Sequence, residues 1–248
     1  MRFRIGQIVP SSNTTMETEI PVILRRFEAQ SEHRFTFHSS RMRMKKVTRE
    51  ELAAMDSESV RCAQELSDAR VDVMGYACLV AIMSAGHGYH RASSAKLEAA
   101  AAENGGPAPV VTSAGALIEG LTALGIRKVA VIAPYTQELT DLVLDYIRAE
   151  GFEITSHIAL GVPDNLEVGA RDPMALVDVA KGLDLAGAEA LVLSACVQMP
   201  SLEAIPVVQA TVGIPVISAA VCTAYRMLKS LGLDTKVPDA GLLLSGEY

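Results

Sequence analysis

The sequence of 248 residues lacks tryptophan, and aromatic residues make up only 4% of it. Half of the residues are hydrophobic, so alanine, valine, leucine and isoleucine must fill the core. A core of this kind is typical of α/β proteins, whose parallel strands are covered on both faces. The length is sufficient for one large domain or two small ones that need no disulfide for stability.

Long apolar runs are also missing. No run approaches the roughly 18 residues that span a bilayer, and the apolar run after the basic N-terminal residues is too short for a signal peptide. We therefore expect no membrane contact. The chain has only four cysteines, which we expect to be reduced thiols of a cytoplasmic protein.

Little in the sequence favours a polyanionic partner. The formal net charge is −7, which argues against binding to nucleic acid or to anionic membranes. The basic cluster Arg41–Lys46 is short and has no interleaved aromatic residues, so we interpret it as a solvated or structural segment.

The common signatures of metal and nucleotide sites are absent. There is no C-x-x-C or H-x-x-x-H pair of the kind that binds zinc. There is also no Gly-rich phosphate loop of either common type. The sequence therefore predicts neither a metal ion nor a nucleotide cofactor.

Two of the four cysteines occur in matched settings. Cys78 follows the apolar run in VDVMGYACLVAIM, and Cys196 follows the one in AEALVLSACVQMP. A cysteine at the end of a buried strand, near backbone N–H groups, can serve as a nucleophile or proton carrier. The residues alone leave open whether these two are a catalytic pair or core thiols. Cys62 lies in a predicted amphipathic helix and Cys222 in the last predicted helix, and we interpret both as core or boundary residues.

The two cysteines belong to a larger duplication. Each half of the chain has a strand that ends in Pro, a strand that ends in Ala-Cys, and a Pro-Val strand that runs into a helix. Strands that alternate with helices predict a parallel sheet in each half. We therefore predict an α/β fold of two similar Rossmann-like halves, related by pseudo-two-fold symmetry.

We expect the halves to exchange elements near residues 113 and 218. The first half is then predicted to comprise residues 1–113 and 218–248, and the second residues 114–217. Ligands of parallel α/β folds bind outside the carboxyl ends of the strands. The predicted active site therefore lies between the halves, where Cys78 and Cys196 face each other.

Two polar segments have both a structural and a functional interpretation. In PSSNTT, Ser12 or Asn13 is a candidate helix N-cap, and the same hydroxyl and amide groups are candidate donors to a carboxylate. In VPDNLEVG, Asn165 is expected in an Asx turn. A Cys-His dyad with His87 or His90 is disfavoured, because SAGHGYHRASS is predicted to be a surface loop and no histidine recurs near Cys196.

The chain resembles the maleate cis-trans isomerase family of the aspartate/glutamate racemase superfamily. The resemblance covers nearly the whole chain, from Ile5 to about Gly246. The arylmalonate decarboxylases share the fold of this superfamily but not the whole set of matching segments. These segments are, in order, VPSSNTTMETEIP, FHSSRMRM, YACLVAIM, TSAGAL, PDNLEVG and LSACVQMPSL.

The resemblance implies that Cys78 is the nucleophile and Cys196 the opposing thiol. It implies a small dicarboxylate substrate, maleate, no cofactor, and a homodimer or higher homo-oligomer. The implied donors to the carboxylates are the side chains of Asn13, Tyr135 and Asn165 and the backbone N–H groups of Val80, Val197 and Gln198.

The expected reaction is addition of a thiolate to the alkene, rotation about the resulting single bond, and elimination to give fumarate. Two alternatives stay open. One is a racemase of an acidic amino acid that uses the two thiols as acid and base. The other is a dicarboxylate-binding protein without catalytic activity.

Overall fold

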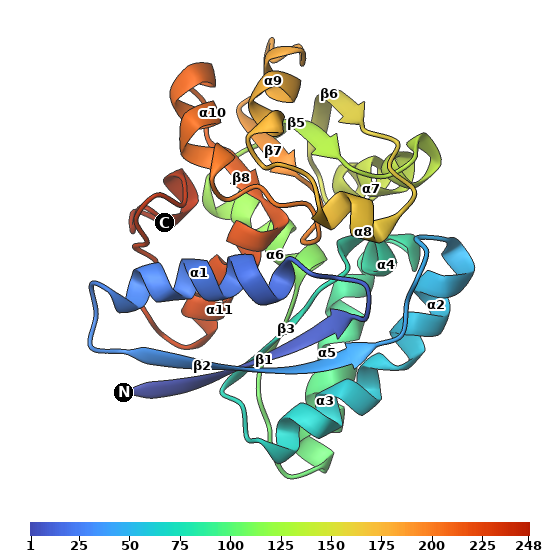
Figure 1. Cartoon of the computed structure of the whole chain (residues 1–248), viewed down its shortest axis with the longest axis vertical. Coiled ribbons are helices and arrows are strands. Elements are labelled where there is room, and N and C mark those ends of the chain that lie inside the picture. The colour runs from blue at the N-terminus through green and yellow to red at the C-terminus, as the bar shows by residue number, and fades with distance from the viewer.

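The computed structural model describes all 248 residues and contains two four-stranded sheets. Their strand orders are β2-β1-β3-β4 and β6-β5-β7-β8, and all the pairings are parallel. The second order repeats the first with each strand replaced by its counterpart. The prediction of two similar α/β halves, each with one parallel sheet, is confirmed (Figure 1).

The first sheet and its helices form the first part of the chain. The strands are β1 (Arg2–Pro10), β2 (Arg34–Met42), β3 (Val73–Tyr76) and β4 (Val110–Thr112). The helices are α1 (Met16–Glu28), α2 (Arg49–Ser57), α3 (Ser59–Asp68), α4 (Leu79–Ser84), α5 (Tyr89–Glu103) and α6 (Ser113–Ala123).

The second sheet follows the same plan. Its strands are β5 (Lys128–Ala133), β6 (Glu153–Ala159), β7 (Ala190–Ser194) and β8 (Val216–Ser218). The helices are α7 (Gln137–Ala149), α8 (Asn165–Gly169), α9 (Ala175–Lys181), α10 (Ala204–Val212) and α11 (Ala219–Ser230), and a 3-10 turn spans Leu242–Leu244. None of the helices is long and apolar enough to cross a membrane.

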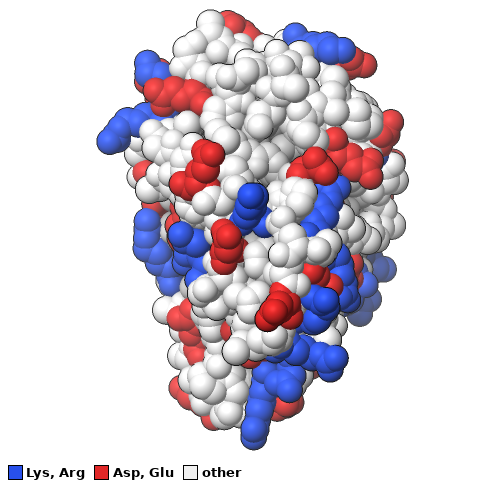
Figure 2. All heavy atoms as spheres, turned by 90° about the vertical axis from the view of Figure 1, so that its left-hand side faces the viewer, with Lys and Arg blue, Asp and Glu red and all other residues white.

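The inner strands are apolar along nearly their whole length because helices cover both of their faces. Every residue of β3 and of β7 is buried. Figure 1 shows α1 and α11 on one side of the first sheet and α3 and α5 on the other. On the face drawn in Figure 2, Lys and Arg are interspersed with Asp and Glu, so no continuous region of one sign covers it.

The structure differs from the sequence prediction in three local features. The edge strands β2 and β6 were not predicted, because they lack the continuous apolar run of the inner strands. The predicted helix that contains Cys62 is divided into two helices, α2 and α3, which meet at Glu58. The expected loop SAGHGYHRASS is a loop only to Gly88, where a left-handed φ of 72° precedes α5.

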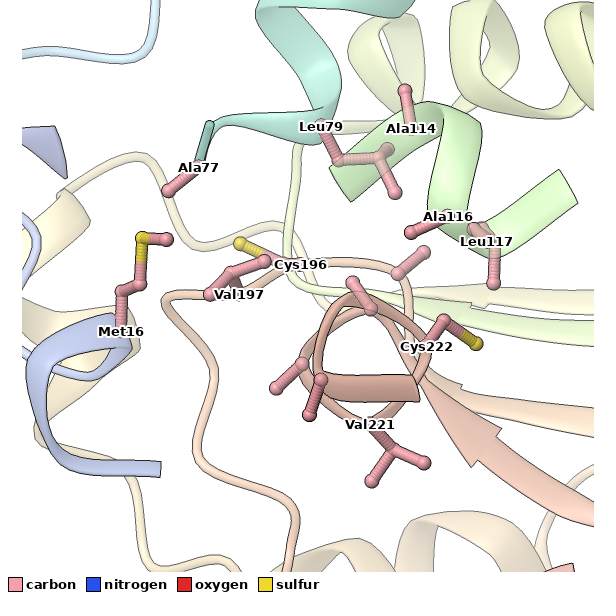
Figure 3. Close-up of a cluster of buried hydrophobic side chains, with 14 of the residues drawn as sticks. Met16, Ala77, Leu79, Ala114, Ala116, Leu117, Cys196, Val197, Val221 and Cys222 are labelled. Carbon is pink, nitrogen blue, oxygen red and sulfur yellow. The ribbon is translucent and has the colours of Figure 1, made fainter. Parts of the chain in front are cut away.

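The last long helix connects the two halves. α11 follows the second sheet in sequence but packs against α1 and β3 of the first half. Gly75 of β3 leaves the space that this requires, since a Cβ there would lie 2.1 Å from Met227 Cε. α11 also packs along α6, where Leu117 and Cys222 belong to one buried cluster (Figure 3). The exact boundaries 1–113 with 218–248 and 114–217 stay a prediction.

The contact between α6 and α11 depends on a glycine. A Cβ at Gly120 would lie 2.7 Å from Cys222 Sγ and 3.1 Å from Leu243 Cδ2. Overpacking a core costs about 1–3 kcal/mol, against a gain of roughly 1 kcal/mol for Ala over Gly in a helix. We expect Gly120→Ala to lower the free energy of unfolding, measured in urea, by up to about 2 kcal/mol.

Cys222→Ala provides the control, because it removes the sulfur that the new methyl group would meet. The loss in free energy of unfolding of the double variant should be about 1 kcal/mol smaller than the sum of the losses in the two single variants. Strict additivity of the two effects would contradict this account of the contact.

Candidate active site

The carboxyl ends of the two sheets enclose one small pocket with a volume of about 290 Å³, including its open mouth. No lysine, arginine, histidine or carboxylate side chain lines it. Every residue predicted for the site lines it except Ser12, whose hydroxyl accepts a hydrogen bond from Asn165. The lining residues are Pro10, Asn13, Met44, Val47, Cys78, Val80, Tyr135, Asn165, Cys196, Val197 and Gln198.

Cys78 lies two residues beyond the end of β3, in a sharp turn. Its backbone is left-handed, with φ 95° and ψ 72°, a conformation that residues with a side chain rarely adopt. α4 begins at the next residue. The Val80 N–H has no acceptor within the protein. The turn thus brings a thiol and an unused donor to the same wall of the pocket.

Cys196 has the equivalent place in the second half, two residues beyond the end of β7. The Gln198 N–H donates to Cys196 Sγ over 3.4 Å, and the Ser194 hydroxyl donates to the Cys196 carbonyl over 2.8 Å. The Val197 N–H has no acceptor within the protein. Of the backbone donors expected from the resemblance, those of Val80 and Val197 are therefore free, whereas that of Gln198 is used by the thiol.

Burial controls the ionisation of both thiols. It raises the pKa of Cys78 to about 12, although the Ala81 N–H opposes this shift. Burial also raises the pKa of Cys196, against the Tyr135 hydroxyl and the Gln198 and Met199 N–H groups. Both thiols are therefore protonated in the unliganded pocket near neutral pH.

Asn13 has two separate tasks on its two side-chain atoms. Its Oδ1 accepts hydrogen bonds from the N–H groups of Thr15, at 3.0 Å, and Met16, at 2.9 Å. α1 starts at Met16 with Thr15 in the cap position, but it is Asn13 that supplies the capping oxygen. This fixes the side chain so that Nδ2, which has no acceptor in the protein, remains available to the pocket.

The Asx turn expected at Asn165 is made by its neighbour. Asp164 Oδ1 accepts from the Leu166 N–H at 2.7 Å and caps α8. Asn165 is thereby free to face the pocket, and its Nδ2 donates to Ser12 Oγ over 2.8 Å. Tyr135 lies across from it, and its hydroxyl donates to the Ala195 carbonyl over 3.1 Å.

Sequence reasoning missed two apolar residues of the wall, Met44 and Val47. Met44 belongs to the basic cluster, in which Arg43, Lys45 and Lys46 are exposed as expected but Met44 is buried. The signal that could have revealed it is the alternation of Arg and Met in RMRM, which indicates an extended segment with two different faces.

The remaining histidines and cysteines lie elsewhere. His87 is exposed and pairs with Asp145 at 2.7 Å, and buried His90 contacts the Tyr146 hydroxyl, so neither lines the pocket. Cys62 and Cys222 are fully buried outside it, as predicted. Figure 3 shows the thiols of Cys196 and Cys222 pointing in different directions within one cluster.

The fold and the pocket define the chain as an α/β protein with one thiol from each half at a shared site. A family model described as arylmalonate decarboxylase matches residues 5–244. A maleate isomerase from Geobacillus stearothermophilus is 62% identical to it over 99% of this chain and 98% of that protein. The chain belongs to the maleate isomerase family, within the group that this model describes, which confirms the resemblance found in the sequence.

Solved structures agree with this assignment. A variant of the maleate isomerase from Pseudomonas putida S16, solved with maleate, has 58% sequence identity and a TM-score of 0.99, over 100% of this chain and 99% of that one. A Cys→Ser variant of the Nocardia farcinica maleate cis-trans isomerase has 45% identity and a TM-score of 0.96 over the full length of both chains. That variant carries a covalently bound succinylcysteine intermediate.

Iodoacetamide should distinguish the four thiols. Cys78 is partly exposed, whereas Cys62, Cys196 and Cys222 are buried, so we expect the first alkylation of the folded protein on Cys78. Because the thiolate reacts and the pKa is raised to about 12, its rate should still rise about tenfold per pH unit between pH 7 and 10. Peptide mass spectrometry gives the site. First modification at Cys62 or Cys222 would contradict the assignment of Cys78 as the most accessible thiol. A rate that levels off near pH 8 would contradict its raised pKa.

Proposed function

We propose that this protein converts maleate to fumarate by reversible addition of the Cys78 thiolate to the alkene. The observation that carries the proposal is the pocket itself, where Cys78 and Cys196 meet among neutral hydrogen-bond donors. The proposed reaction is an isomerisation without net oxidation, hydration or group transfer, so it requires no cofactor. From the family resemblance we also infer a homo-oligomer that works in the cytoplasm.

The proposed substrate is a small planar dianion, and the pocket offers donors for both of its carboxylates. Asn13 Nδ2 and the N–H groups of Val80 and Val197 have no acceptor within the protein. Tyr135 and Asn165 add a hydroxyl and an amide. A cis-to-trans change moves one carboxylate through a large angle, and neutral single donors oppose this movement less than a bidentate arginine would.

In the proposed reaction the Cys78 thiol first loses its proton to solvent, and the resulting thiolate sulfur bonds to one alkene carbon. The electrons of the broken π bond move to the other carbon and its carboxylate, where backbone N–H groups stabilise the developing enediolate. A proton from the Cys196 thiol then gives a saturated adduct, whose central bond rotates. Cys196 thiolate removes a proton from that carbon, the double bond re-forms in the trans geometry, and the Cys78 thiolate leaves.

The relatives support the covalent part of this proposal. The Nocardia farcinica variant with its succinylcysteine intermediate shows that a cysteine of that enzyme bonds to the substrate skeleton. A succinyl group is saturated, so an adduct of that kind has also gained a proton. In the present pocket, burial keeps Cys196 protonated, which is the form that a proton donor needs.

Proton NMR of maleate with the purified protein tests the proposal directly. We expect the vinyl signal of maleate to be replaced by that of fumarate, and Cys78→Ala to reduce the rate by at least about a thousandfold without loss of the fold. Parallel reactions with both enantiomers of aspartate test the racemase alternative. Tight binding of maleate without turnover would instead identify a binding protein, and a folded Cys78→Ala variant with a tenth of the activity would exclude Cys78 as the nucleophile.

Asn13→Asp should separate the two tasks of Asn13. Aspartate keeps the oxygen that caps α1, whereas Asn13→Ala removes that oxygen and should lower the stability by about 1 kcal/mol. Aspartate also replaces the free donor by a negative charge, so kcat/KM for maleate should fall about a hundredfold or more. Thermal unfolding and initial rates provide the measurements. Unchanged kcat/KM in Asn13→Asp would exclude this donor from the site.

A further inference from the structure

A buried carboxylate lies just outside the pocket and takes no part in the proposed chemistry. Glu19, in the first turn of α1, is only 8% exposed and forms no ion pair with a basic side chain. Burial raises its pKa, and the nearby Glu203 adds to the shift. A buried carboxylate without a cation is costly unless hydrogen bonds compensate it.

The compensating hydrogen bonds all come from the other half of the chain. Glu19 Oε1 accepts from the Ser201 N–H at 2.6 Å and from the Leu202 N–H at 2.7 Å. The Ser201 hydroxyl lies 3.5 Å from Oε2. Ser201 and Leu202 precede α10. The Ser201 carbonyl accepts hydrogen bonds from the N–H groups of Ala204 and Ile205, at the start of this helix. Glu19 therefore fixes the end of the segment that starts at Cys196.

The rest of this segment, residues 196–202, is attached at two more points. Ser194 Oγ holds the Cys196 carbonyl, and Thr15 Oγ1 donates to the Gln198 carbonyl at 2.7 Å. Figure 3 shows Met16, at the start of α1, close to Val197. α1 thus holds the segment at Gln198 and again at Ser201, and Cys196 and Val197 belong to the same short stretch of chain.

We propose that Glu19 is a positioning residue, which holds the segment 196–202 against α1 and thereby sets the place of the Cys196 thiol and the free Val197 N–H in the pocket. The importance of Cys196 for turnover rests on the proposed function. A displacement of about 1 Å in a reacting group can cost about a hundredfold in rate. Loss of the Glu19 hydrogen bonds should therefore reduce kcat more than it raises KM.

The choice of variants follows from the geometry. Both backbone N–H groups bond to the single atom Oε1, so the amide oxygen of Glu19→Gln can replace it, whereas Glu19→Ala removes the acceptor and Glu19→Asp withdraws it by one carbon. The matched control is Glu28→Ala on the same helix. Glu28 is also largely buried and accepts the Phe35 N–H, but it lies at the far end of α1.

Steady-state kinetics give the first readout. We expect kcat for maleate to fall about 10–100-fold in Glu19→Ala, with KM within about threefold, and to stay within about threefold of the unaltered protein in Glu19→Gln. Glu28→Ala should lose stability but keep its kcat. If Glu19→Ala does not fold, Glu19→Asp replaces it. A kcat unchanged in the alanine or aspartate variant, or a glutamine variant as slow as alanine, would overturn the proposal.

Alkylation of Cys196 gives a second readout that needs no turnover. We compare these variants in the Cys78→Ser background. Glu19→Ala should change the rate of iodoacetamide modification at Cys196 several-fold and should shift its pH dependence. Glu28→Ala should change neither. Rates at Cys62 and Cys222 serve as internal references. An unchanged Cys196 rate would overturn the positioning role. Absence of maleate turnover in the unaltered protein would remove the proposed function but leave this test intact.

Discussion

The side-chain amide of Gln198 connects three of the loops that form the pocket. Its Oε1 accepts the Thr14 N–H at 2.8 Å, and its Nε2 donates to the Asn165 carbonyl at 2.6 Å and to the Ser12 carbonyl at 3.2 Å. These groups follow β1, β6 and β7, so one buried amide links both halves of the chain. Gly169 permits the close approach, since a Cβ there would lie 2.4 Å from Gln198 Nε2. The relative placement of Asn13, Asn165 and Cys196 depends on this connection.

The second constraint is electrostatic. The pocket is closely surrounded by apolar groups and backbone, so a charge inside it is poorly solvated, and the protein supplies no cationic side chain to compensate. Backbone N–H groups and side-chain amides are therefore the groups that can stabilise a negative charge in the pocket. The same burial that keeps the thiols protonated in the free protein strengthens every hydrogen bond to a carboxylate that enters. In the proposed reaction, stabilisation by neutral donors leaves the carboxylates of the substrate free to turn.

The two thiols have equivalent places in the two halves, but the backbone and the hydrogen bonds around them differ. Cys78 occupies a left-handed turn directly before a short helix, whereas the segment after Cys196 runs on to α10 and is fixed by Ser194, Thr15 and Glu19. Cys78 is partly exposed and Cys196 is buried. The two thiols thus differ in exposure, which in the proposed reaction suits Cys78 to attack the alkene and Cys196 to carry a proton.

The repeated order of strand-Pro, strand-Ala-Cys and Pro-Val-strand determined much of the fold and the location of the site. Buried parallel strands have a continuous apolar signature, and their carboxyl ends always meet at one edge, so Cys78 and Cys196 could be placed together from local patterns. The edge strands β2 and β6 carry no such signature and were missed. The family resemblance, rather than the pattern, indicated Tyr135 and the backbone donors.

Other features were decided only by the tertiary structure. Asn13 and Ser12 are equally good capping residues in the sequence, and only the path of the chain into α1 made Asn13 the cap and left its Nδ2 free. Glu19 reads as an ordinary helix residue until the second half places two N–H groups beside it. In the sequence Met44 belongs to a basic segment, and only the structure shows that it lines the pocket. Each of these roles depends on residues far away in the chain. The local sequence determines whether a segment tends to form a helix, strand or turn, but it does not determine which distant residues lie beside that segment.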